Sequence, residues 1–135
     1  MNHLSLLSSP NPPKKAPAKI NRNSKVFKTI IKSILDKKGE HVVSMDLRKI
    51  PEAVADFFII CEAGSTTQVK AIADHIEQQM KQLCGEIPYR TEGRSSAQWV
   101  LVDYVNIVIH IFYPETRKFY RLEEMWSDAE VLEHH

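Results

Sequence analysis

The feature that most constrains the fold is the stretch from Trp99 to Phe112, where two alternating runs of apolar residues flank a short connection. Alternation with a period of two residues is typical of β-strands whose two faces meet different surroundings, so this stretch predicts a β-hairpin. With Tyr104-Val105 as a two-residue turn, Asp103 would pair with Asn106. Neither turn residue favours a positive φ, so a longer loop could shift the register, and only an even shift would preserve the two faces.

The predicted register gives the hairpin two chemically different faces. One face is entirely aliphatic and is expected to lie under the helices: Val100, Val102, Ile107, Ile109 and Ile111. The other face mixes aromatic, apolar and ionisable side chains: Trp99, Leu101, Asp103, Val108, His110 and Phe112. Because a closed core rarely combines such residues, the second face is predicted to be a contact surface for a partner.

The residues before the hairpin predict two helices and two strands. Apolar residues recur at helical spacing from residue 24, and Gly39 follows at the position of a C-terminal cap. Residues 42–47 and 56–61 are predicted strands that form a hairpin. A second helix is predicted over residues 66–84, with Ser65 as its cap and Gln68 in the capping-box position.

Residues 87–91 are a predicted short strand, and residues 116–131 return to helical spacing. The resulting order is α-β-β-α-β-β-β-α. The sequence therefore predicts an α/β (α+β) fold, in which a mixed β-sheet of about five strands has helices packed on at least one face.

The two ends of the chain are predicted to stand outside this domain, which spans residues 24–131. Residues 1–23 combine Pro, Lys, Ser and Asn with few apolar residues, which favours a flexible basic tail. Residues 132–135 resemble the start of a polyhistidine tag. The tail lacks the features of a secretory signal, which favours a bacterial cytoplasmic protein, but its acid-poor, Ser-rich composition leaves an organellar transit peptide open.

Charge is distributed unevenly along the chain and bears on the kind of partner. Residues 1–38 hold nine Lys and Arg against Asp36 alone, whereas residues 39–135 hold nine against sixteen acids. An acidic body suits a basic protein partner better than nucleic acid, and sequence-specific nucleic-acid binding is not predicted. The basic tail either stays solvated or touches RNA loosely. No apolar run is long enough for a membrane helix, so no membrane contact is expected.

Catalytic and metal-binding readings find little support in the sequence. Gly64-Ser65 at a helix start resembles the signature of nucleotidyltransferases, but Asp103 has no second carboxylate spaced to hold magnesium, so an enzyme of that type is only an alternative. Cys61 and Cys84 lack metal-ligand spacing and are predicted to be buried thiols. No cofactor is expected. His110 could be structural, part of an interface or an acid/base group.

Five blocks of the sequence, in order, resemble the Iojap family of ribosomal silencing factors. They cover about residues 24–128 and are Asp56-Phe-Phe-Ile-Ile-Cys-Glu-Ala-Gly-Ser65, Gln68-Val-Lys-Ala-Ile-Ala-Asp-His75, Glu92-Gly-Arg-Ser-Ser-Ala-Gln-Trp99, Asp103 with Val108-Ile-His-Ile-Phe112, and Arg117-Lys-Phe-Tyr-Arg-Leu-Glu-Glu-Met-Trp126. Gln98 departs from the family pattern, in which an acid often precedes the tryptophan.

The resemblance implies a nucleotidyltransferase-like fold without catalytic carboxylates. It also implies binding to ribosomal protein number fourteen of the large subunit, which blocks joining of the small subunit when nutrients are scarce. A ribosome assembly adaptor that binds RNA and a homodimer are further readings. The family's contact positions, together with the second hairpin face, give the predicted partner-binding residues: Trp99, Leu101, Asp103, His110, Tyr120, Glu123 and Trp126.

Overall fold

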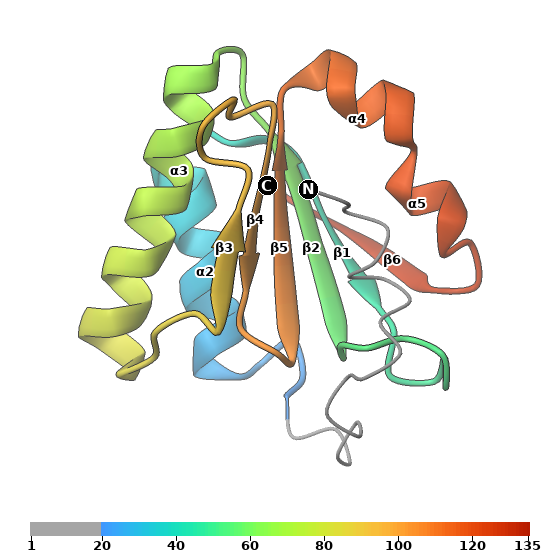
Figure 1. The fold of residues 1–135 in the computed structure, drawn as a ribbon. Helices are drawn as coiled ribbons and strands as arrows, with labels where there is room; N and C mark the ends of the chain where they lie inside the picture. Colours follow the sequence, from blue (N-terminus) through green and yellow to red (C-terminus); the bar gives the residue numbers. More distant parts are fainter. Residues whose placement is uncertain (1–19) are drawn as a thin grey trace.

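The computed structural model describes residues 20–135 as one mixed sheet with helices on both of its faces (Figure 1). The elements in chain order are α2 (Lys25–Asp36), β1 (Glu40–Asp46), β2 (Phe57–Glu62), α3 (Thr66–Gln79), the π-helical turn η1 (Met80–Cys84), β3 (Arg90–Glu92), β4 (Trp99–Asp103), β5 (Ile107–Phe112), α4 (Pro114–Tyr120), α5 (Leu122–Met125) and β6 (Glu130–His134). The strand order is β3-β4-β5-β2-β1-β6, and only β2 and β5 run parallel. The predicted α/β class is confirmed, and a sixth strand is added.

The hairpin of β4 and β5 is confirmed, but its register differs from the predicted one by two residues. Asp103 pairs with Val108 rather than with Asn106. A carboxylate oxygen of Asp103 accepts a hydrogen bond from the Val105 backbone N–H at 2.7 Å, and Val105 takes a φ of 71°. This local bond closes a longer loop than the two-residue turn. The shift is even, so each side chain stays on its predicted face.

The predicted aliphatic face forms the larger core, beneath α2 and α3. Ile109 and its neighbours on the hairpin pack there against the apolar stripes of both helices, which include Ile30 of α2 and Ile72 of α3. The cap of α3 is as predicted, because the Ser65 hydroxyl accepts from the Gln68 N–H at 3.1 Å. The Gln68 side chain does not complete the capping box. It donates instead to the Lys37 carbonyl at 3.1 Å, which ties α3 to the end of α2.

The opposite face of the sheet is a second core, and the prediction that it is an exposed contact surface is wrong. Trp99, Leu101 and His110 are at most 3% exposed. They lie beneath residues 47–55 and beneath Leu122 and Trp126 from the α5 region. The mixed polarity of the sequence reflects this different cover, because aromatic rings and the Trp99–His110 hydrogen bond are packed here among aliphatic side chains.

The C-terminal region differs most from prediction. The single helix expected over residues 116–131 is broken at Arg121, whose φ of 49° is left-handed and cannot continue an α-helix. The chain then returns as β6, which pairs antiparallel with β1, so that Ser44 faces Leu132. Residues 132–134 therefore belong to the sheet, and their predicted exclusion from the fold is wrong.

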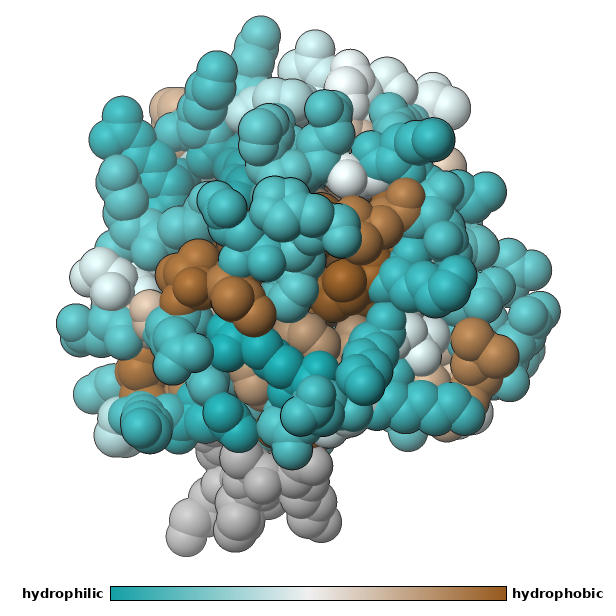
Figure 2. Space-filling model, turned by 180° about the vertical axis from the view of Figure 1, so that it is seen from behind, coloured by the Kyte–Doolittle hydropathy of each residue, from teal (hydrophilic) through white to brown (hydrophobic). Residues whose placement is uncertain are grey.

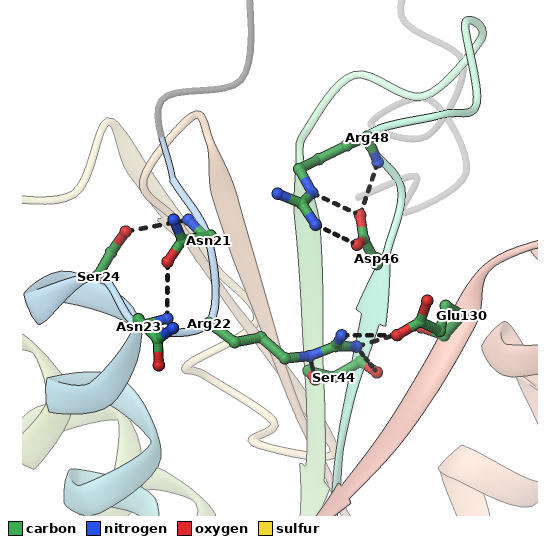
Figure 3. A network of polar contacts seen from close by, with 8 residues as sticks. All are labelled: Asn21, Arg22, Asn23, Ser24, Ser44, Asp46, Arg48 and Glu130. Carbon is green, nitrogen blue, oxygen red and sulfur yellow. Dashed lines mark hydrogen bonds and ion pairs between the residues drawn. The ribbon is translucent and has the colours of Figure 1, made fainter.

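Arg22 fixes this added strand from the other end of the sequence (Figure 3). Its guanidinium donates to the Ser44 hydroxyl at 2.9 Å and pairs with the Glu130 carboxylate at 3.1 Å. One side chain thus connects three parts of the fold, which are the residues just before α2, strand β1 and strand β6. Most of the predicted tail over residues 1–23 lies outside the described residues, but Arg22 shows that its last part belongs to the folded domain.

The two cysteines differ in burial, and this difference predicts a difference in reactivity. Cys61 is fully buried, and burial raises the pKa of its thiol to about 12, so no thiolate forms near neutral pH. Cys84 is only half-buried, contrary to the prediction that both thiols are buried. We expect iodoacetamide at pH 8 to alkylate Cys84 alone in the folded protein and both cysteines in guanidinium, as measured by peptide mass spectrometry. Alkylation of native Cys61 would contradict this burial.

Candidate partner-binding face

A cluster of aromatic rings fills the second core beneath α4 and α5. The Trp99 indole N–H donates to Nδ1 of His110 at 3.1 Å, and the Trp99 ring lies 4.8 Å from the Phe112 ring between centroids. The Phe58 ring meets His110 edge-on at 4.7 Å. Because Nδ1 of His110 accepts this hydrogen bond, the imidazole orients Trp99 and is unavailable at that atom for acid/base chemistry.

The outer layer over this cluster carries large exposed side chains. Phe119, Tyr120 and Met125 are 78%, 42% and 48% exposed, and Glu123 and Trp126 are half-buried beside them. We call these five residues the α4–α5 face. Single exposed apolar residues are ordinary on a protein surface, but a group of this size rimmed by charges is typical of an interaction site.

Two residues of this face, Tyr120 and Trp126, are anchored to the aromatic cluster. The Tyr120 ring lies 4.7 Å from that of Trp99, and the Trp126 ring meets Phe58 edge-on at 6.1 Å. The Trp126 indole nitrogen is buried without a hydrogen-bond partner among residues 20–135. Trp126 therefore serves as core and surface at once, which the sequence left undecided.

Arg117 holds the bend between α4 and α5 in place. Its guanidinium donates to Glu62 of β2 at 3.0 Å, to Glu123 of α5 at 3.0 Å and to the His41 carbonyl at 2.8 Å. The Arg117 side chain is only 10% exposed, so these bonds are shielded from water more than a surface ion pair is. The position of the α4–α5 face is thus tied to the sheet through one residue.

Asp103 is separated from this face. It lies four residues along β4 from Trp99, a distance of roughly 13 Å at about 3.3 Å per residue. Its carboxylate shapes the hairpin loop and lies 3.5 Å from Arg90, while burial raises its pKa above the usual value. The structure gives Asp103 a structural task at the far end of the sheet.

The structure therefore brings together six of the seven predicted residues: Trp99, Leu101, His110, Tyr120, Glu123 and Trp126. Trp99, Leu101 and His110 are buried, whereas Tyr120, Glu123 and Trp126 reach the surface. Sequence reasoning missed Phe119 and Met125 as surface residues, because they lie on the apolar stripe of the single expected helix. Sequence reasoning also missed that Arg117 bridges α4, α5 and the sheet. The one indication was that Arg117 lies in a sequence block that resembles the family.

Neither a metal centre nor a membrane span is found in the described part of the chain. Across residues 20–135, no group of three or more His, Cys, Asp and Glu side chains is placed to hold a metal ion. No helix there has the length and apolar character needed to cross a bilayer. The chemistry available at the α4–α5 face is that of binding through aromatic rings, a thioether and a carboxylate.

Comparison with known proteins identifies the family. Residues 20–135 match the family model described as "Ribosomal silencing factor during starvation". Ribosomal silencing factor RsfS of Halalkalibacterium halodurans is 37% identical over 111 residues, covering 82% of this chain and 93% of that protein. Protein Iojap, chloroplastic, of Zea mays is 34% identical over 77 residues, covering 57% of this chain and 32% of that protein.

Solved structures agree with this assignment. A crystal structure of a protein from Chromobacterium violaceum superimposes with a TM-score of 0.72 at 30% identity, covering 76% of this chain and 84% of that one. The family model, the sequence relatives and the fold support the same family assignment. The chain belongs to the ribosomal silencing factor family, to which Iojap is related.

Proposed function

We propose that this protein represses translation by binding ribosomal protein number fourteen of the large ribosomal subunit, which sterically blocks joining of the small subunit, especially when nutrients are limiting. Its family membership makes it a ribosome-associated regulatory factor, and its relatives are named as silencing factors rather than as enzymes. The single observation that carries the proposal beyond the family is the exposed α4–α5 face over a rigid aromatic cluster. This action takes place in the bacterial cytoplasm and needs no cofactor.

The α4–α5 face has the composition of an interface centre. Aromatic residues and methionine are enriched at such centres, where they supply large buried apolar area. Phe119 and Met125 would fill apolar pockets of the partner. The carboxylates of Glu123 and Glu124, which already pair with Arg117 and Arg121 in this chain, would also face Lys or Arg of a basic ribosomal protein. Binding here requires no rearrangement of the core.

The buried members of the predicted site act from beneath in this proposal. Trp99 and His110 hold the ring of Tyr120 in position, and Leu101 fills the core beside them. A second copy of the chain could meet the same face, so we also propose that a homodimer would compete with the ribosome for it.

The proposal predicts that the double variant Phe119→Ser/Met125→Ser loses binding to large subunits by at least about 10-fold, because two central apolar contacts are removed. Binding is measured by co-sedimentation with purified large subunits of the source organism. The matched control is Ile87→Ser/Tyr89→Ser, which replaces two residues that are 72% and 71% exposed elsewhere on the surface. Both variants should keep the stability of the parent. Equal binding by the two variants, or no binding by the parent, would overturn the proposal.

A further inference from the structure

A hollow lies on the other side of the sheet, between α2 and the end of α3. It has a volume of about 340 Å³. It is lined by α2, by Asn23 just before that helix, by Gln79 at the end of α3 and by Leu83 of η1; the lining residues of α2 are Lys25, Lys28, Thr29, Lys32, Ser33 and Asp36. We call it the α2 groove. Figure 2 shows the molecule from behind, where hydrophilic side chains cover most of the surface and several separate hydrophobic areas lie among them.

The α2 groove is positively charged although the folded body is acidic. Lys25, Lys28 and Lys32 are all exposed and lie three and four residues apart, so they form one stripe of roughly 10 Å at 1.5 Å per residue. The acid within the groove, Asp36, is already paired with Lys32 at 3.3 Å and lies 3.6 Å from His75. Among the described residues, Lys25 and Lys28 make no ion pair, although Glu86 borders Lys25 in a neighbouring hollow.

We propose that the α2 groove binds the phosphate backbone of RNA. Two uncompensated lysines on a rigid helix give a linear array of charge, which fits a chain of phosphates. The side-chain amides of Asn23 and Gln79 lie in the same groove and can donate to phosphate or sugar oxygens. The groove offers no aromatic ring for base stacking among its lining residues, so the contact is to the backbone and independent of sequence.

The identity of this RNA rests on the proposed function, under which it is ribosomal RNA of the large subunit. α2 and the α4–α5 face cover opposite sides of the sheet (Figure 1), so occupying one does not obstruct the other. A ribosomal protein bound at one face and RNA at the other would fix the orientation of the molecule, which a single contact face cannot do alone. The acidic composition of residues 39–135 argued against nucleic acid as a partner. The basic α2 groove provides a local site where RNA can nevertheless bind.

The test compares Lys25→Gln/Lys28→Gln with Lys49→Gln/Lys70→Gln in the full chain. Both variants remove two exposed lysines and therefore the same net charge, and both keep residues 1–19 intact. The probes are a fluorescein-labelled poly(U) RNA of about 20 nucleotides and a labelled poly-glutamate peptide of equal length, each followed by fluorescence anisotropy between about 50 and 200 mM salt, a range that resolves the salt slope.

We expect the groove variant to bind poly(U) about 10-fold more weakly than the control variant. The slope of log K against log salt should be smaller by roughly 1.4, since each single-strand phosphate contact contributes about 0.7. Equal RNA affinities of the two variants would overturn the proposal. Loss of poly-glutamate binding with unchanged RNA binding would also overturn it, in favour of an acidic protein partner.

Co-sedimentation with large subunits separates this inference from the proposed function. If the parent binds subunits and the groove variant binds them more weakly than the Lys49/Lys70 control, the RNA is ribosomal. If the parent binds poly(U) through the groove but does not sediment with subunits, the proposed function fails and the groove assignment stands.

Discussion

Trp99→Ala is expected to lower the free energy of unfolding by about 3–5 kcal/mol, the usual cost of removing a large buried aromatic side chain. The indole is 3% exposed and contacts the rings of Phe112, His110 and Tyr120. Its loss leaves a cavity and also removes the donor that His110 accepts from. Urea denaturation followed by circular dichroism measures the change.

Two further variants separate the effects of packing and hydrogen bonding. Trp99→Phe keeps most of the ring volume but lacks the indole N–H, so it should cost less than the alanine variant. Phe119→Ala, at an exposed position, should change stability by less than about 0.5 kcal/mol. A Trp99→Ala protein as stable as the parent would show that the tryptophan is not packed as described. The expected instability also means that reduced ribosome binding by Trp99→Ala would not identify Trp99 as a contact residue.

Gly93→Ala is expected to destabilise the fold by more than about 2 kcal/mol. Gly93 has a φ of 90°, which residues with a side chain rarely adopt, and an added Cβ would collide with the Trp99 backbone carbonyl. The backbone oxygen cannot move without displacing the start of β4. The neighbouring Arg94 pairs with Asp74 and Glu77 of α3, so the same loop also connects the sheet to this helix.

Gly64→Ala is the matched control for this substitution. Gly64 has no atom within 4 Å of an added Cβ, and its φ lies outside the left-handed region. Its replacement should shift the thermal midpoint by only a small amount, whereas Gly93→Ala should lower it by several degrees or prevent folding. Similar midpoints for the two variants in differential scanning calorimetry would contradict the strain assigned to Gly93.

The sequence predicted the first core better than the second because the two are built differently. Where one face of a hairpin is entirely aliphatic, as with Val100, Val102 and Ile109, the pattern indicates only burial under helices. The pattern around Trp99 and His110 fits two structures, because the same side chains suit either an interface or a core with an internal hydrogen bond. Only the three-dimensional cover from residues 47–55 and α5 decides between them.

Two other features could not be predicted from residue propensities alone. The loop after Asp103 is set by a local side-chain bond, which outweighs the poor turn propensity of Tyr104-Val105. β6 is short and half-exposed, and it is a strand because β1 offers an open edge and Arg22 reaches across to Glu130. Neither partner is visible in the local pattern of residues 130–134, which reads as the end of a helix.

The pairing of β1 with β6 also constrains the order in which the chain can fold during its own synthesis. β1 is made early, but Ser44 meets His134 across 90 residues of chain, and β2 must likewise wait for β5. Contacts of such sequence separation form late, after the intervening chain has left the ribosome. The α4–α5 face lies within that late segment and needs Glu62 of β2 to hold Arg117. A nascent chain therefore cannot complete the sheet, or the support of the α4–α5 face, until both Arg117 and β6 have been made.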